Sequence, residues 1–443
     1  MEVFLLKALQ LVLSLSILVV VHELGHFLFA RAFKVRVEKF YLFFNPWFTP
    51  FKFKPKNGET EYGIGWLPLG GYCKISGMID ESMDKEQMAQ PPKPYEFRSK
   101  PSGQRLLIMV AGVLFNFILA MFIYSMILFA WGDTFLPLNH MKMGLAYGDT
   151  FKSVGFEDGD MLLKADDRPL ERLDFGTFRA ITNARVVTVR RHGSELGIVI
   201  PDDMMQRLMR EKKPFFAEMR YPMVADRMDG DRSPAALAGI QPGDTIVSID
   251  DVATPTAYDM SQQLATKKDR NIAVGIVRNG DALSLTLHTD TAGKMGLYLQ
   301  SPYQLYQTVT KEYGFFDSFP AGIQLGLATL KGYVSDMKYV FTKEGASSLG
   351  GFGTIGNLFP AAWDWRSFWM TTAFLSIILA FMNILPIPAL DGGHVLFLLY
   401  EVVARRPPSD KFLEYAQIAG MIVLFGILIY ANGNDLFRFF FDR

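Results

Sequence analysis

The sequence is poor in residues that would tie a small secreted fold together or attract a polyanion. It has one cysteine, Cys73, so no internal disulfide can form. Its 45 basic residues are balanced by 45 acidic ones, which disfavours a nucleic-acid partner, because such a partner requires a basic surface. Half of the 443 residues are hydrophobic and 14% are aromatic, so the chain is neither disordered nor a disulfide scaffold. A mean hydropathy of +0.15 indicates a mixture of membrane-embedded and water-exposed parts.

Long uncharged segments predict membrane-spanning helices. Residues 106–131, 367–390 and 415–434 carry no charge, and each reaches the roughly 20 residues that cross a hydrocarbon core. A fourth apolar run, 11–21, ends at His22 without the small-residue cleavage site of a signal peptide, so we expect it to be retained. We therefore predict four transmembrane helices, at 1–33, 104–131, 365–400 and 412–434.

The distribution of positive charge predicts the orientation of these helices. Residues 31–105 contain thirteen Lys and Arg against eight acidic residues, and the last short connection carries Arg405, Arg406 and Lys411. Because positively charged loops stay in the cytoplasm, both segments are expected there, including a cytoplasmic-side region at 34–103. The long insert after the second helix, and both termini, are then expected outside.

The insert contains an internal duplication. Five residues recur after 84 positions: Gly155, Gly159, Asp160, Asp166 and Asp167 become Gly239, Gly243, Asp244, Asp250 and Asp251. Strands are expected at 245–249, 186–190 and 272–277, with helices between them. The pattern of glycine, three residues, Gly-Asp and a buried strand resembles the PDZ domain, which predicts two PDZ-like α+β domains at 132–216 and 217–292. Two generic β-rich domains are the alternative.

Residues 51–54 and 62–65 alternate apolar and polar side chains around Asn57 and Gly58, a hairpin turn signal. They predict a β-hairpin within 34–103. Sequence alone leaves open whether this hairpin dips into the membrane or is an ordinary cytoplasmic one.

A second segment with two interpretations lies between the insert and the third span. Within the linker 293–364, residues 318–330 are uncharged but too short to span a bilayer. Lysines lie close to this segment on both sides. We expect an interfacial helix, and a buried helix of the outer insert would have the same pattern.

The most specific motif is His22-Glu23-Leu24-Gly25-His26, which fits H-E-x-x-H. Histidines at i and i+4 share one face of a helix and can bind one Zn²⁺, while the glutamate between them can take a proton from water. An ionisable group in a membrane span is costly and is kept mainly for function. The alternative is a helix end whose polar side chains reach the membrane surface.

Asp391 is the best candidate for a third zinc ligand, because catalytic zinc commonly has three protein ligands. It lies where the third span reaches the same side of the membrane as the H-E-x-x-H motif. Pro386 and Pro388 are expected to break the helix there, and the glycines that follow free the backbone to aim the carboxylate. Asp391 could instead cap a helix, and His394 stays possible as a ligand.

These residues together resemble the site-2 protease family of intramembrane zinc proteases. The family motifs match His22, Glu23 and His26, the Leu-Asp-Gly element at Asp391, the Asn-x-x-Pro stretch at Asn383, and residues 112–116 of the second span. The resemblance implies that the two histidines and the aspartate hold Zn²⁺ and that Glu23 is catalytic. It also implies that Asn383 and Asn116 contact substrate and that the hairpin lies in the membrane beside the site.

The resulting prediction is a multi-span α-helical membrane protein with four transmembrane helices, two tandem PDZ-like domains and a membrane-associated β-hairpin. By resemblance it is an inner-membrane endopeptidase that cleaves in or beside the transmembrane segment of single-span proteins, such as an anti-sigma factor already trimmed by another protease. Its expected partners are these substrates, the lipid bilayer, and peptide C-termini at the PDZ-like domains. A noncatalytic PDZ scaffold is the main alternative. A transporter would require repeat symmetry among the spans, which the sequence lacks.

Overall fold

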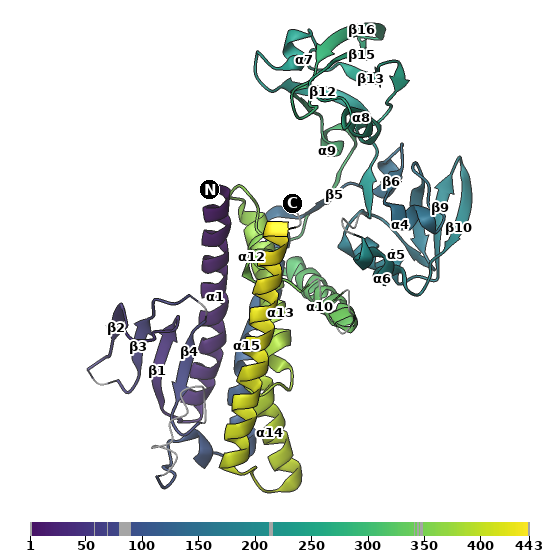
Figure 1. Ribbon diagram of the computed structural model, residues 1–443. Coiled ribbons are helices and arrows are strands. Elements are labelled where there is room, and N and C mark those ends of the chain that lie inside the picture. The colour runs from purple at the N-terminus through teal and green to yellow at the C-terminus, as the bar shows by residue number, and fades with distance from the viewer. Residues whose placement is uncertain are drawn as a thin grey trace. The chain divides into compact units, whose positions relative to one another are not determined.

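The computed structural model describes residues 2–441 except 57, 69, 79–89, 212–215, 341, 343–344 and 346–348. The chain forms two compact units, which are best considered separately (Figure 1). One contains Met1–Gly132 and Glu312–Arg443, and the other is the insert, Asp133–Lys311. The expected turn at Asn57 lies outside the described residues.

The first unit is mainly helical. Its helices are α1 (Glu2–Ala32), the short 3₁₀ helix η1 (Phe97–Ser99), α3 (Ser102–Trp131), α10 (Phe315–Val340), α12 (Phe352–Gly356), α13 (Trp365–Ile384), α14 (Asp391–Ala404) and α15 (Asp410–Phe441). Among the described residues, four helices are long and apolar enough to cross a membrane: α1, α3, α13 and α15. The chain therefore has the helices of a multi-pass membrane protein, and these four candidate spans agree with the prediction.

The predicted third span is not one continuous helix. Residues 365–400 divide between α13 and α14, and the intervening loop contains Pro386 and Pro388. The break follows from the chemistry of proline, which lacks the N–H that a helix interior requires. The expected helix break is therefore present, and Asp391 becomes the first residue of α14.

Helices α1 and α3 approach each other closely through glycine. A Cβ atom on Gly25 would lie 2.5 Å from the carbonyl oxygen of Ala111, so a larger residue would push the helices apart. Gly112 faces the H-E-x-x-H motif from α3, and a Cβ there would lie 2.7 Å from Cε1 of His22. The two glycines therefore let the histidine-bearing face of α1 rest directly on the backbone of α3.

Helix α10 includes the predicted segment 318–330 and packs on α3. A Cβ on Gly322 would lie 2.6 Å from Cα of Ser125, and one on Gly326 would lie 2.6 Å from Cε of Met121. The alternative that this segment is a buried helix of the insert is therefore wrong, because α10 belongs to the helical unit. Its position at the membrane surface stays a prediction.

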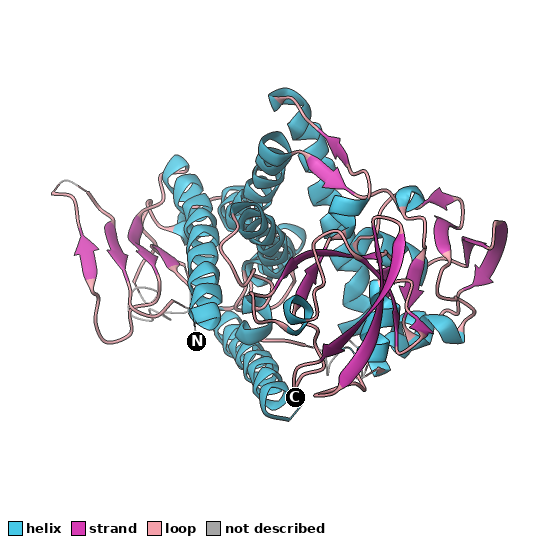
Figure 2. Ribbon diagram, turned by 90° about the horizontal axis from the view of Figure 1, so that it is seen from above, coloured by secondary structure: helices cyan, strands magenta, loops and turns pink. Residues whose placement is uncertain are grey.

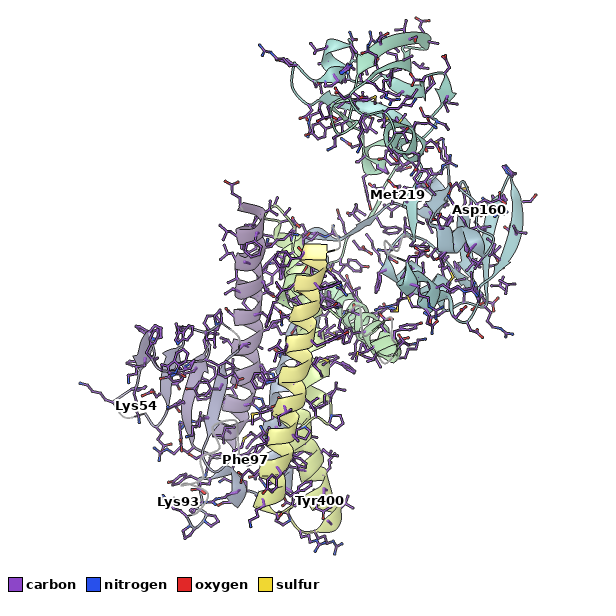
Figure 3. The ribbon with its side chains drawn as sticks, viewed as in Figure 1. Lys54, Lys93, Phe97, Asp160, Met219 and Tyr400 are labelled. Carbon is purple, nitrogen blue, oxygen red and sulfur yellow. The ribbon has the colours of Figure 1, made fainter. Side chains whose placement is uncertain are left out.

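A four-stranded sheet lies beside α1, as Figures 1 and 2 both show. Its strands are β1 (Val37–Leu42), β2 (Phe51–Phe53), β3 (Glu61–Ile64) and β4 (Tyr72–Ile75), in the order β2-β3-β1-β4. Strands β2 and β3, both expected, pair antiparallel with Lys52 opposite Gly63. Lys54, labelled in Figure 3, lies at the side of the sheet away from α1. The sequence did not predict β1 and β4, which complete the sheet next to α1.

A hydrophobic core joins this sheet to the helices. It is formed by side chains of α1, β1, β4, α3 and α14, and it includes Phe97, labelled in Figure 3. Val37 and Ile108 are almost completely buried there. Since burial of apolar surface stabilises a fold by about 25 cal/mol per Å², this core fixes the sheet against the end of α1 that carries the histidines.

The insert contains two repeats of one α+β unit, as the duplication predicted. The first repeat is built from β6 (Leu145–Tyr147), α4 (Asp149–Ser153), β7 (Met161–Ala165), β8 (Arg168–Pro169), α5 (Phe175–Thr182), β9 (Val186–Arg191), β10 (Ser194–Val199), α6 (Met204–Arg210) and β11 (Ala217–Met219). The second is built from β12 (Met223–Met228), α7 (Pro234–Leu237), β13 (Thr245–Ile249), β14 (Val252–Ala253), α8 (Ala257–Leu264), β15 (Asn271–Arg278), β16 (Asp281–His288) and β17 (Leu297–Leu299). The remaining elements are β5 (Asp133–Phe135), η2 (Leu138–His140), α9 (Pro302–Leu305) and β18 (Val309–Lys311).

The predicted boundary between the repeats is wrong by a few residues. Strand β11, which the sequence assigned to the second domain at 217–292, pairs with β6 of the first repeat. Strand β17 lies beyond residue 292, yet it pairs with β12 of the second repeat. These pairings join strands far apart in sequence, so local patterns carry no signal for them. Membership of either repeat in the PDZ family stays a prediction.

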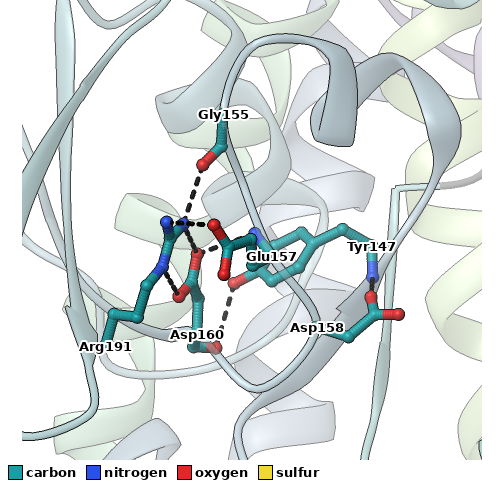
Figure 4. A network of polar contacts seen from close by, with 6 residues as sticks. All are labelled: Tyr147, Gly155, Glu157, Asp158, Asp160 and Arg191. Carbon is teal, nitrogen blue, oxygen red and sulfur yellow. Dashed lines mark hydrogen bonds and ion pairs between the residues drawn. The ribbon is translucent and has the colours of Figure 1, made fainter.

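The same ion-paired turn occurs in both repeats, and Figure 4 shows the first. Arg191 donates to both carboxylate oxygens of Asp160, at 2.7 Å each, and to the carbonyl of Gly155. In the second repeat Arg278 donates in the same way to Asp244 and to the carbonyl of Gly239. Both aspartates are almost completely buried, so each duplicated Gly-Asp turn is fixed to a strand more than thirty residues later.

Candidate metal centre

The two motif histidines are buried between α1 and α3, and their outer ring nitrogens come together. Nδ1 of His26 lies 2.8 Å from the carbonyl oxygen of Ile108. Because a carbonyl only accepts, Nδ1 carries the proton, and in the neutral ring Nε2 keeps a free lone pair. Nε2 of His26 is 3.2 Å from Nε2 of His22, so both rings offer the same nitrogen to one point.

Asn116 fixes the ring of His22 from α3. Its amide group lies 3.3 Å from Nδ1 of His22, and its Oδ1 accepts no hydrogen bond among the described residues. Amide oxygen and nitrogen are interchangeable assignments, and turning the amide over lets Oδ1 accept the Nδ1 proton. Asn116 is completely buried and does not line the cavity described below. Its position therefore supports a role behind His22 and not the expected contact with substrate.

The loop between α13 and α14 brings Asp391 to the histidines. Its Oδ2 atom lies 3.1 Å from Nε2 of His22 and 3.3 Å from Nε2 of His26. The adjacent glycine is necessary, because a Cβ on Gly392 would lie 2.5 Å from the carbonyl carbon of Ile384. As the first residue of α14, Asp391 also lies at a helix N-terminus, which favours a carboxylate.

The three atoms form a nearly equilateral triangle with the geometry of a zinc site. Bonds of about 2.0–2.1 Å in a tetrahedron place ligand atoms about 3.3 Å apart, which matches the observed 3.1, 3.2 and 3.3 Å. Oδ2 of Asp391 accepts no hydrogen bond among the described residues, although it is buried. With both rings neutral, the three converging lone pairs repel one another unless a cation binds. The donor set therefore fits Zn²⁺ with one open position.

The other residues predicted for the site lie close to this triangle. The described residues with metal-ligand spacing are His22, His26 and Asp391, and His394 is outside that group. An amide atom of Asn383 lies 3.5 Å from Nε2 of His22, so Asn383 reaches the centre from the end of α13. Glu23 lines the same cavity as the three candidate ligands.

The candidate site opens into a cavity of about 420 Å³. Its lining includes strand β4 with the residues just before it, and Ala389, Asp391 and Gln417. The backbone of Cys73 in β4 donates a hydrogen bond to the carboxylate of Glu23. Strand β4 is at the edge of its sheet, so the cavity places an edge strand next to an acidic side chain.

Sequence reasoning missed Gln417 and Cys73, and it indicated Gly112 and Asn116 only through the family motif at residues 112–116. Gly112 and Asn116 are four residues apart on α3, so both face α1, and this spacing identifies them as the surface behind the histidines. Gln417 gave a weaker signal, as a polar residue near the start of a predicted span. Cys73 contacts Glu23 through its backbone, and the identity of a side chain does not predict such a backbone contact.

Comparisons with known proteins agree with this chemistry. The model of peptidase family M50 matches residues 10–427. A protein of Borreliella burgdorferi that is named as a zinc metalloprotease is 28% identical over 441 residues, covering 96% of this chain and 97% of that protein. Metalloprotease MmpA of Caulobacter vibrioides is 26% identical over 455 residues, covering 98% and 96%. The regulator of sigma-E protease RseP of Salmonella typhimurium is 28% identical over 472 residues, covering 96% and 97%.

Proposed function

The chain belongs to peptidase family M50 and is a zinc metalloendopeptidase, and we propose that it cleaves other membrane proteins within or beside a transmembrane segment. The resemblance to site-2 proteases is thereby confirmed, and a regulator of sigma-E protease is among the similar proteins. The triangle of His22, His26 and Asp391 beside Glu23 carries the proposal. These residues belong to or adjoin spanning helices, so the substrate bond must come to the membrane.

In this proposal His22, His26 and Asp391 hold one zinc ion. When bound, zinc polarises the scissile carbonyl and makes water a stronger acid. Glu23 takes the proton of the attacking water and passes it to the leaving amine. Asn383 donates a hydrogen bond to the oxygen that gains charge, because its amide lies within 3.5 Å of Nε2 of His22.

The cavity also suggests how the substrate backbone is held. A transmembrane helix protects its peptide bonds within its own hydrogen bonds, so it must unwind before hydrolysis. The edge strand β4 lines the cavity and can pair with an unwound segment by strand addition. The exposed aromatic side chains of Trp47 and Phe51 near the other edge of this sheet support its contact with the bilayer.

For the cellular arrangement we propose an inner-membrane location with the insert outside and the metal centre toward the cytoplasm. The charge distribution of the connecting loops supports this orientation. The two repeats then restrict access, so that a substrate with a bulky outer domain is excluded and a trimmed one enters. If the second repeat acts as a PDZ-like domain, it also binds the freed C-terminus of a trimmed substrate. An anti-sigma factor is the substrate class proposed by analogy with RseP.

The alternative of a noncatalytic scaffold is less consistent with the site. A scaffold has no need for two buried histidines and a carboxylate whose lone pairs converge inside a helical membrane unit. Burying such groups costs several kcal/mol without a partner, so their convergence supports a metal-dependent reaction.

The decisive experiment compares two variants of the site with the wild type. We expect Glu23→Gln to retain zinc and lose cleavage, because it removes the base and leaves the ligands. We expect Asp391→Ala to lose both. Metal content of purified protein and cleavage of a single-span substrate in membranes provide the measurements. Wild-type zinc content and activity in Asp391→Ala would refute the site.

A separate experiment tests the role of the insert. Gly243 has a φ of +92°, so Gly243→Val strains the duplicated turn. We expect this variant to keep cleaving a trimmed substrate and to begin cleaving an untrimmed one, at matched expression. If it loses the trimmed substrate and still rejects the intact one, the insert is required for catalysis or folding, and the access role is wrong.

A further inference from the structure

Helix α15 is exposed over most of its length, yet one polar residue on it is buried beside the metal centre. The side chains of Ile422, Phe425 and Ile429 are more than half exposed, as expected for a helix that faces lipid. Gln417 in the same helix is 3% exposed. A buried amide in a membrane span is costly unless it has a partner, so its contact is informative.

That partner is the loop that carries Asp391. The side-chain oxygen of Gln417 accepts a hydrogen bond from the backbone N–H of Ala389 at 3.2 Å. Ala389 has a φ of +79°, a conformation that a residue with a side chain adopts only under constraint. Asp391 follows two residues later, so this hydrogen bond fixes the backbone that aims the carboxylate.

A glycine on α15 lets the helix approach the same loop. A Cβ on Gly420 would overlap the carbonyl oxygen of Pro388 and would lie 2.9 Å from its Cβ. Gly420 is three residues after Gln417, so both are on one face of α15. Gly426, further along the same helix, has open space around its Cα. The close approach is therefore local to the loop.

We propose that Gln417, seated by Gly420, is a positioning residue that holds the strained loop and thereby sets the zinc affinity contributed by Asp391. The inference rests on the proposed function, because it takes Asp391 as a ligand. Gln417 acts on the metal through Ala389 and the loop. Displacement of α15 from the loop would then weaken the metal centre without touching any ligand.

The expected effect on zinc affinity follows from the behaviour of groups that orient metal ligands. Loss of such a group typically weakens metal binding by about 10- to 100-fold. Gln417→Met keeps the length and apolar volume of the side chain and removes the acceptor oxygen. Gln417→Glu keeps an acceptor for the Ala389 N–H. The pair separates loss of the hydrogen bond from loss of packing.

The experiment measures zinc affinity of the purified full-length protein in detergent by competition with a chelator, and kcat and KM on a membrane substrate. We expect Gln417→Met to weaken zinc binding by at least about tenfold and to lower kcat at zinc concentrations below saturation, with KM unchanged. We expect Gln417→Glu to restore much of the affinity. Gly420→Ala should weaken zinc binding, while Gly426→Ala, the same change in open space, should not.

The outcomes separate this inference from the proposed function. If Asp391→Asn binds zinc as tightly as the wild type, the assignment of the metal ligand fails. If Asp391→Asn weakens binding but Gln417→Met does not, only the role of Gln417 fails. Equal zinc affinity of Gly420→Ala and Gly426→Ala also overturns the proposed role of Gln417 and Gly420. Should Gly420→Ala fail to fold, Gln417→Met alone decides, because it places no new atom against the backbone of the loop.

Discussion

The contact between Gly112 and the two histidines predicts that a single methyl group disables the site. In Gly112→Ala the new Cβ would lie 2.7 Å from Cε1 of His22, whereas ordinary contact begins at 3.4 Å, and it would overlap the ring of His26 as well. The hydrogen bond between His26 and the carbonyl of Ile108 ties α1 to α3, so the ring of His22 must rotate or shift by about 0.7 Å and that of His26 by more. The ligand triangle has edges of 3.1–3.3 Å and cannot absorb such a shift.

Misplacement of catalytic groups by about 1 Å can cost 100-fold in rate, which corresponds to about 2.7 kcal/mol. We therefore expect Gly112→Ala to lower kcat/KM by about 100-fold and to reduce zinc content. Gly103→Ala is the matched control, because Gly103 is on the same helix in open space. Zinc content and cleavage of both variants should be measured at equal expression. Wild-type zinc and activity in Gly112→Ala would show that α1 and α3 do not pack as described.

Two further predictions concern the insert and the topology. Hydrogen bonds from Arg278 hold the pKa of Asp244 below its ordinary value of 3.8, so their stabilisation is present at neutral pH and is lost as the pH falls below that value. Arg278→Met should therefore lower the unfolding temperature at pH 7 by more than at pH 3, and an equal decrease at both would contradict this. A membrane-impermeant thiol reagent applied from outside should label a cysteine at Ser194 and leave Cys73 unlabelled, whereas outside labelling of Cys73 would reverse the proposed orientation.

The candidate ligand set can be proposed from the sequence because each part has local chemistry. His22 and His26 share a helix face by their spacing, and Asp391 follows two prolines that must end a helix. The spans are equally accessible, since their length and lack of charge are set by the bilayer. The duplicated Gly-Asp turns are visible in the sequence because each buried aspartate forms an ion pair with an arginine.

Features that depend on contacts between distant segments are not predictable in this way. Strand β4 is four residues long, and its pairing with β1 is decided by the helix beside it. Strand β11 pairs within the first repeat and not the second for the same reason: tertiary packing decides which strands pair. The family motif led to the expectation that Asn116 contacts substrate. A motif alone cannot distinguish a side chain that lines the cavity from one that lies behind a metal ligand.

The length of α13 has a consequence for the lipid environment. Its 20 residues extend about 30 Å, which equals the thickness of a typical hydrocarbon core, and the loop that leads to Asp391 follows at once. Helix α1, with 31 residues, is about 46 Å long and can tilt, but α13 has no spare length. Hydrophobic mismatch in a thicker bilayer would therefore draw the loop toward the acyl chains. Acyl-chain length becomes a variable that tunes turnover, with an optimum where the bilayer matches α13.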